Sequence, residues 1–107
     1  MSSRVADHVD AFNQAVTTGD WTTFVTRFAE DARMTFVGVP AGPYTGRAAI
    51  TEAYQTNPPA ETISLVDLTT DADTDTARFV WSSGPTGTMN LTWTPTGHLA
   101  TLTITFD

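Results

Sequence analysis

Cysteine and lysine are both absent from the 107 residues of this sequence. Without cysteine the chain has no disulfide bond, thiolate nucleophile, thiolate-bound zinc or iron–sulfur cluster. No stretch approaches the roughly 18 to 20 consecutive apolar residues of a membrane-spanning helix. Residues 1–8 also lack the apolar core of a signal peptide. We therefore expect a cytoplasmic protein with no membrane partner.

Basic side chains are scarce as well. Five arginines stand against twelve Asp and Glu residues, for a net charge of -7. Nucleic acid phosphates need a basic surface, so we expect no nucleic acid partner. The two histidines, His8 and His98, lie far apart in the sequence and form no metal-binding motif, so we expect no metal and no other cofactor. With 40% apolar residues, the chain is suited to a single folded domain over 1–107.

Three segments have the apolar spacing of amphipathic helices: 4–17, 20–31 and 47–55. Ser2 or Ser3 can cap the first of these helices, because a serine hydroxyl accepts a hydrogen bond from a free amide of the first turn. The N-terminal half of the chain is therefore predicted to be mostly helical.

Alternating apolar residues predict β-strands in the rest of the chain. The first strand covers 33–39, and Thr45-Gly46 is expected to cap the third helix. From Glu61 onward four alternating runs are separated by turn signals: Ile63–Asp67, Ala77–Trp81, Met89–Trp93 and Leu102–Phe106. Helices first and strands last predict an α+β domain, in which the helices cover one face of a curved antiparallel sheet.

Three motifs and their order resemble a known superfamily: Thr18-Gly19-Asp20-Trp21, Arg27-Phe28-Ala29-Glu30-Asp31-Ala32 and Tyr44-Thr45-Gly46-Arg47-Ala48-Ala49-Ile50. Over essentially its whole length the chain resembles the nuclear transport factor 2-like (cystatin-like) superfamily. It is most similar there to small bacterial SnoaL-like and ketosteroid isomerase-like proteins. The resemblance implies a cone, in which a bent sheet and three N-terminal helices surround a pocket.

The resemblance does not imply the isomerase reaction. Ketosteroid isomerases use a tyrosine on the first helix, an aspartate base on the first strand and a protonated aspartate on a later strand. Matching the shared motifs puts Phe12, Phe36 and Met89 at these positions, so the familiar dyad is absent. Related epoxide hydrolases need an Asp-Arg-Asp set, and Arg78 is expected to point away from the pocket.

Three residues are weak candidates for a catalytic role: Asp67, His8 and Tyr44. Asp67 is in phase with Ile63 and Leu65 and could face the pocket as a base. His8 could reach the pocket mouth and transfer a proton, or could be a partly exposed residue on the flank of its helix. Tyr44 could hydrogen-bond a ligand carbonyl, or could cover the pocket with its hydroxyl in water. The alternative for Asp67 is a solvated strand end beside Asp71, Asp73 and Asp75.

The inward positions predict a mostly apolar pocket. The large aromatic residues among them could offer flat walls to a ligand or simply fill the cone. The residues expected to line the ligand site are Phe12, Val16, Met34, Phe36, Tyr44, Tyr54, Phe79, Trp81, Met89, Leu91, Leu102 and Phe106.

The opposite faces of the late strands are rich in threonine and carry little charge. Their β-branched side chains suit a sheet surface. The resemblance implies a homodimer through this face, because members of the superfamily commonly pair there, and the alternative is a solvated, threonine-rich face. We call it the outer sheet face; it comprises Thr76, Arg78, Val80, Thr88, Asn90, Thr92, Thr101, Thr103 and Thr105.

Three functional hypotheses follow. The first is a protein that binds a small hydrophobic or polycyclic molecule without an established reaction. The second is a cofactor-free polyketide cyclase or isomerase that uses Asp67 or His8 as its acid or base. The third is a non-catalytic dimerisation module whose cone is filled by its own aromatic side chains.

Overall fold

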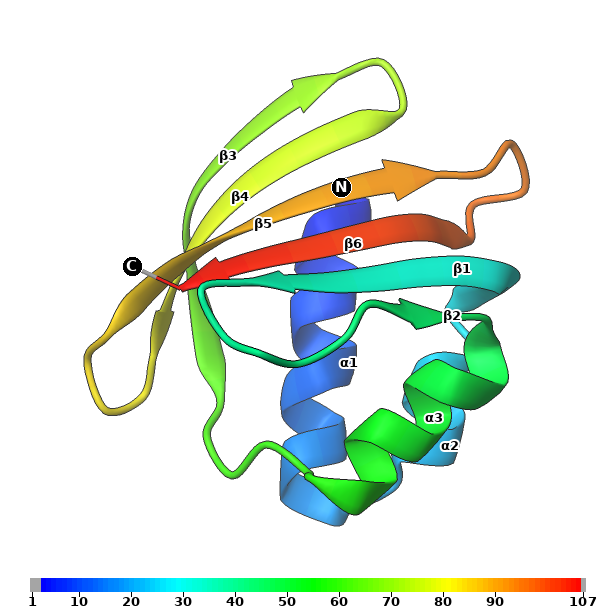
Figure 1. Ribbon diagram of the computed structural model, residues 1–107. Coiled ribbons are helices and arrows are strands. Elements are labelled where there is room, and N and C mark those ends of the chain that lie inside the picture. The colour runs from blue at the N-terminus through cyan, green and yellow to red at the C-terminus, as the bar shows by residue number, and fades with distance from the viewer. Residues whose placement is uncertain (1–2, 107) are drawn as a thin grey trace.

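The computed structural model describes residues 3–106. Six strands form one curved, unclosed sheet in the order β2-β1-β6-β5-β4-β3, and three helices lie against one of its faces (Figure 1). This is the predicted α+β arrangement. In chain order the elements are α1 (Arg4–Thr18), α2 (Trp21–Val25), β1 (Phe28–Val37), β2 (Tyr44–Thr45), α3 (Arg47–Thr56), β3 (Ile63–Asp71), β4 (Thr74–Trp81), β5 (Thr86–Trp93) and β6 (Leu99–Phe106).

The sheet is mixed, not wholly antiparallel as predicted. β1 and β6 pair in parallel, whereas the other neighbouring strands pair antiparallel. Apolar alternation shows which face of a strand is buried, but it does not show which strand lies beside it. The short strand β2 adds to the predicted strands: Tyr44 and Thr45 pair with Met34 and Arg33, so Thr45 belongs to the sheet and does not cap α3.

The second helix is shorter than predicted. It ends at Val25, and β1 begins at Phe28, ahead of the predicted strand at 33–39. Phe28 is paired with Leu99 of β6. Phe24 and Phe28 are both buried and four residues apart, so their spacing fits a continuous helix as well as this helix-to-strand junction. The pairing with β6, which is distant in the sequence, decides between the two.

Strand β3 contains a register shift between Leu65 and Asp67. Val66 and Asp67 are both exposed, and the inward alternation resumes at the half-buried Leu68. The prediction that Asp67 shares an inward face with Ile63 and Leu65 is therefore wrong. Its Oδ1 instead accepts a hydrogen bond from the Leu68 amide at 2.9 Å.

Helix α1 begins and ends as its sequence indicates. The Ser3 hydroxyl accepts a hydrogen bond from the Ala6 amide at 2.9 Å, while Ser2 lies outside the described residues. At the other end Gly19 has φ +78°, a left-handed conformation that favours glycine after a helix. Within residues 3–106 no helix has both the length and the apolar character to cross a membrane.

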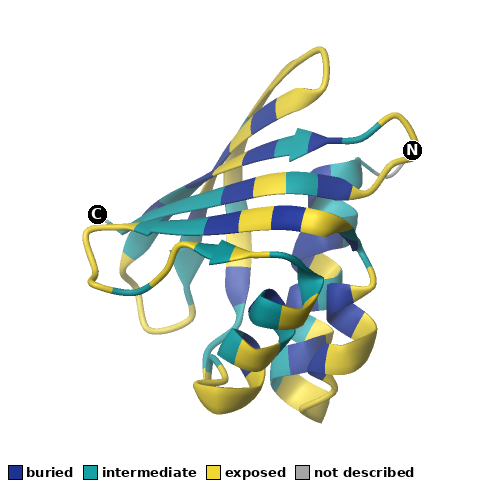
Figure 2. Cartoon of the chain, turned by 45° about the vertical axis from the view of Figure 1, so that its right-hand side comes forward, coloured by how far each residue is buried: buried dark blue, intermediate teal, exposed yellow. Residues whose placement is uncertain are grey.

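The core lies between the helices and the inner face of the sheet. Buried and exposed residues alternate along the later strands (Figure 2). On the helical side, Trp21 of α2 stacks on Tyr54 of α3 with 4.7 Å between ring centroids, and Phe24 meets Tyr54 edge to face. Such aromatic pairs stabilise the contact beyond the area that they bury. The short helix α2 is therefore held mainly by its aromatic side chains.

A buried carboxylate joins the start of α1 to the sheet. Asp75 is 1% exposed, and its Oδ2 accepts hydrogen bonds from Arg4 Nε at 2.7 Å and Trp93 Nε1 at 2.8 Å. Burial by itself raises the pKa of Asp75, but hydrogen bonds from Arg4, Thr70 and Trp93 outweigh it and hold the pKa below the ordinary value. The interpretation of Asp75 as a solvated turn residue is wrong, because it lies inward in β4.

Candidate functional site

A cavity of about 210 Å³ lies between α1, the end of α3 and the inner face of the sheet. Its lining is mostly apolar and comes from nearly every element of the fold. The lining residues are His8, Phe12, Phe36, Tyr54, Asn57, Pro59, Ile63, Phe79, Trp81, Met89, Leu102, Ile104 and Phe106.

The cavity has a closed floor and an open rim. Phe79, Met89 and Leu102 are almost completely buried, because they occupy inward positions in the middle of β4, β5 and β6. At the rim Trp81 is only half-buried and Asn57 is exposed. Trp81 is the last residue of β4 and Asn57 follows the end of α3, so the opening lies at the end of β4 beside the segment after α3.

Three aromatic rings form a row along the rim. Phe36 stacks with Phe106 at 6.1 Å between centroids, and Phe106 stacks with Trp81 at 6.4 Å. Phe12 of α1 meets Trp81 edge to face at 6.3 Å. The rim of the cavity is therefore lined by aromatic rings from both the sheet and α1.

A glycine makes room for the floor. Gly87 occupies an inward position of β5, where an added Cβ would lie 2.5 Å from Phe79 Cζ and 2.9 Å from the carbonyl oxygen of Thr105. No Cβ fits at such distances, so the Phe79 ring occupies the space that a side chain at 87 would take. The signal was present in the sequence, since Gly87 has the inward phase of Met89 and an isolated glycine in a strand often marks a close approach.

His8 lies on the cavity floor, not at its mouth or on an exposed helix flank. It is 2% exposed and packs against Phe24 and Phe28, at 5.3 and 6.1 Å between ring centroids. Its Nδ1 is buried and has no hydrogen-bond partner within residues 3–106. Burial, and then the positive charge of Arg27, lower the pKa of His8 to about 3. The imidazole is therefore neutral at physiological pH.

A second hollow of about 260 Å³ adjoins the cavity and contains Tyr44. The two spaces share Phe36, Tyr54, Asn57 and Pro59. The Tyr44 ring meets Phe36 edge to face at 6.2 Å. Tyr44 therefore lies beside the cavity mouth, on the far side of Phe36.

The structure brings most of the predicted pocket residues together. Phe12, Phe36, Tyr54, Phe79, Trp81, Met89, Leu102 and Phe106 line the cavity, and Met34 and Tyr44 line the adjoining hollow. Val16 and Leu91 line neither space. Asp67 lies outside both and is exposed. Sequence reasoning missed four lining residues: Asn57, Pro59, Ile63 and Ile104.

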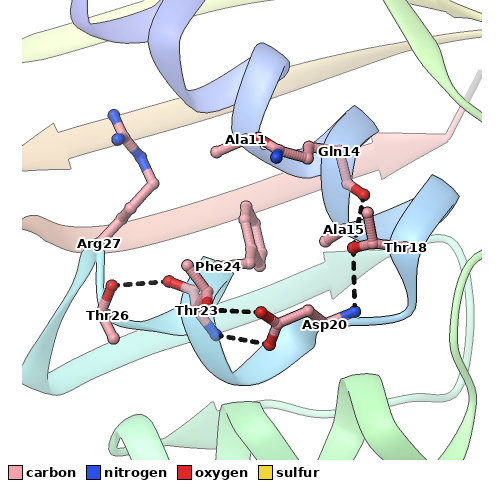
Figure 3. A pocket seen from close by; sticks show the side chains of 9 residues that line it. All are labelled: Ala11, Gln14, Ala15, Thr18, Asp20, Thr23, Phe24, Thr26 and Arg27. Atoms are coloured by element: carbon pink, nitrogen blue, oxygen red, sulfur yellow. Dashed lines mark hydrogen bonds between the residues drawn. The ribbon is translucent and has the colours of Figure 1, made fainter.

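A further hollow of about 210 Å³, between α1 and α2, is polar and structural in character (Figure 3). Asp20 accepts hydrogen bonds there from the Thr23 amide at 3.1 Å and the Thr23 hydroxyl at 2.6 Å. The Thr23 hydroxyl and amide bonds hold the pKa of Asp20 below its ordinary value. Thr18 and Thr26 bond to nearby backbone atoms. These groups stabilise the corner between the two helices.

The chemistry available in the cavity is limited. Phe12, Phe36 and Met89, at the positions where related isomerases carry polar groups, present apolar side chains to the cavity. No group of three His, Cys, Asp or Glu residues that could hold a metal ion occurs in the described part of the chain. The polar groups of the related isomerases are thus replaced by apolar side chains at these three positions.

Solved structures support the fold. A candidate ketosteroid isomerase from Kribbella flavida is 18% identical with a TM-score of 0.74, over 97% of this chain and 78% of that one. A candidate polyketide cyclase from Sinorhizobium meliloti is 24% identical with a TM-score of 0.71, over 92% and 93%. The Mycobacterium tuberculosis protein RV0760c is 12% identical with a TM-score of 0.78, over 100% and 93%.

At such low identities these likenesses establish the fold alone. Comparison with curated proteins found no match. A family model described as the SnoaL-like domain matches residues 9–101, which is most of the chain. That span runs from the middle of α1 through β5 to the start of β6, and it includes most of the residues around the cavity. The chain therefore belongs to the SnoaL-like domain family, within the nuclear transport factor 2-like fold.

Proposed function

We propose that this protein binds a small hydrophobic molecule in the cavity between α1 and the sheet. The observation that carries the proposal is the combination of a mostly apolar lining with two buried polar rings, His8 and Tyr54. Ligand sites are typically concave and apolar with a few placed polar groups. A flat ligand would enter the cavity by passing the aromatic rings at its rim.

The size of the cavity narrows the ligand. Sites for drug-sized ligands usually span roughly 300 to 1,000 Å³, whereas this cavity has about 210 Å³. A molecule of one or two rings fits this space better than a larger polycyclic one. The adjoining hollow of about 260 Å³ offers room for a substituent that extends past Phe36.

Catalysis by a cyclase or isomerase has less support. Asp67 is exposed on the outer side of β3. His8 does face the site, but its pKa of about 3 makes it a weak base at neutral pH. Tyr44 lines only the adjoining hollow. None of the three candidates thus combines position with a suitable proton affinity.

The proposal includes a homodimer through the outer sheet face. Thr76 and Asn90 hydrogen-bond across β4 and β5 at 3.2 Å, and the hydroxyls of Thr92 and Thr101 hydrogen-bond across β5 and β6. These bonds restrain the four side chains on a surface that carries little charge. Such a surface can pack against a second copy with little loss of side-chain entropy.

A thermal-shift experiment tests the binding proposal. One- and two-ring apolar compounds should raise the melting temperature, and four-ring compounds should not. A ligand at about 100 times its Kd adds about 2.7 kcal/mol of stability, equivalent to about 10 °C or more for a domain of this size. Ile104→Trp should fill the cavity and abolish the shift, while Thr69→Trp on the outer side of β3 should preserve it. The absence of any shift with the wild-type protein would refute the proposal.

A further inference from the structure

The floor of the cavity holds one polar side chain whose hydrogen-bonding capacity is unused. His8 is 2% exposed and lines the cavity, and its Nδ1 has no partner among the described residues. Its ring edges are surrounded by Phe24 and Phe28, which offer no hydrogen bonds. A buried polar atom without a partner raises the free energy of the folded protein, and a ligand group that pairs with this ring can recover part of that loss.

Most of the side chains buried deep in the cavity are apolar. Phe79, Met89 and Leu102, which are almost completely buried in the lining, are apolar. Tyr54, the second buried polar ring of the lining, stacks on Trp21 and lines both the cavity and the adjoining hollow. At the end of the cavity where Phe24 and Phe28 pack, the His8 ring is the partner for a polar ligand atom.

The lining also sets the charge of the ligand. No Asp, Glu or Arg side chain lies among the lining residues, and the imidazole of His8 is neutral. An ionised ligand would lose its hydration in this apolar space without gaining a counter-ion. A neutral imidazole offers one donor and one acceptor nitrogen, so it suits both a hydroxyl and a carbonyl group.

We propose that the ligand is a neutral molecule of one or two rings with a hydroxyl or carbonyl group at its buried end, and that His8 is the positioning residue that hydrogen-bonds this group. The inference rests on the proposed binding function and adds the chemical class and orientation of the ligand. In it His8 transfers no proton and acts through a single hydrogen bond.

Three probes of the same two-ring skeleton test the inference: naphthalene, β-naphthol and β-naphthoate. Their affinities are measured by calorimetric titration. A net hydrogen bond should make β-naphthol bind about five- to tenfold more tightly than naphthalene. The carboxylate of β-naphthoate should make it the weakest of the three.

Variants of His8 test whether its ring causes the preference for β-naphthol over naphthalene. His8→Phe keeps an aromatic ring among Phe24 and Phe28, and the ratio of the β-naphthol affinity to the naphthalene affinity should fall to about one, whatever the affinity for naphthalene itself. His8→Gln, which keeps a donor and an acceptor, should retain part of the preference. His98→Phe is the matched control, because His98 is exposed in the turn before β6 and should leave all three affinities unchanged.

Nitrogen chemical shifts of the labelled imidazole supply a second readout. The His8 resonances should move with β-naphthol and stay in place with naphthalene, which a purely structural role for His8 does not predict. Equal affinities for naphthalene and β-naphthol, or a preference that survives in His8→Phe, would overturn the inference and leave the binding function standing. Tightest binding of β-naphthoate would also overturn it. If none of the three probes binds, both proposals fall.

Discussion

Asn13 of α1 and Ile63 of β3 are joined by two hydrogen bonds. Asn13 Nδ2 donates to the Ile63 carbonyl oxygen at 2.8 Å, and Asn13 Oδ1 accepts from the Ile63 amide at 2.9 Å. The side-chain amide thus pairs with the backbone of Ile63 as a neighbouring strand would. Because Ile63 lines the cavity, this pair sets the distance between the helix and the edge of the site.

Asn13→Leu should destabilise the protein by about 2 kcal/mol, since both backbone groups of Ile63 lose their partner. Urea unfolding measures the change. Gln14→Leu, at an exposed position of the same helix, should change stability by less than about 0.5 kcal/mol. Equal stabilities of the two variants would show that the amide pair contributes nothing.

Asp75→Ala should cost about 2 kcal/mol or more. The substitution leaves the Trp93 Nε1 donor buried without a partner and releases Arg4, whose half-exposed guanidinium can be solvated again. The matched control is Asp71→Ala, at an exposed position near the same turn. Urea unfolding should separate the two variants, and similar losses in both would contradict the assignment of Asp75 as a structural carboxylate.

Gly87→Ala should both destabilise the protein and reduce the cavity. Relieving the contact with Phe79 requires the ring to move, at a cost of about 1 to 3 kcal/mol. Displacement of the ring into the cavity should weaken naphthalene binding, which calorimetric titration measures. Thr88→Ala, at the next position along β5, is the control and should leave naphthalene binding unchanged. Unaltered affinity in Gly87→Ala would mean that the Phe79 ring moves elsewhere.

The buried His8 should make stability depend on pH between about 6.5 and 4.5. Its pKa is about 3 in the folded protein and returns to 6.5 on unfolding. Between these values the unfolded chain binds the additional proton, so stability falls as the pH is lowered. The loss should approach about 1.4 kcal/mol per pH unit well below pH 6.5, as followed by urea unfolding at successive pH values.

Two histidine variants separate the pH dependence caused by His8 from the pH dependence caused by carboxylates. Asp20, Glu61 and Asp75 have lowered pKa values, so their contributions are lost only as the pH falls below their ordinary values of 3.8 to 4.5. His8→Phe should flatten the profile above pH 4.5, and His98→Phe should not. A steep profile that persists in His8→Phe would assign the pH dependence to another group.

The proposed dimer predicts about twice the monomer mass in light scattering after size exclusion. Thr103→Lys places a charge on the outer sheet face at β6, where dimerisation would bury it, and should shift the protein to the monomer. Thr56→Lys, at the exposed end of α3, should leave the mass unchanged. A wild-type protein that stays monomeric up to its solubility limit would rule the dimer out.

The predicted elements and their order were largely sufficient to reach the fold. The stripe of apolar residues on α1 and the alternation along β4, β5 and β6 each report a buried face, and together they predict helices packed on one side of a sheet. They also identify Phe79, Met89 and Leu102 as inward residues, which the structure places on the cavity floor. The alternation along the strands also predicts that the rim residues Phe36, Trp81 and Phe106 face inward.

Asp67 and His8 show where such patterns stop. A strict alternation points Asp67 inward, but the register shift in β3 turns it to the surface. His8 reads as the flank of a helix stripe, and it is buried because Phe24 and Phe28, from two other elements, close over it. Neither the register shift in β3 nor the packing of Phe24 and Phe28 over His8 can be predicted from the identity of Asp67 or His8.

Local spacing and composition were enough to predict the fold class and the limits of α1, because both depend on the pattern of apolar residues along the chain. Tertiary structure alone decided the parallel pairing of β1 with β6, the burial of Asp75 beneath Arg4 and the position of His8 on the floor. Each of these depends on contacts between residues far apart in the chain. A pattern read along one segment records how much of it is buried, whereas the partner that buries it is set by the packing of the whole domain.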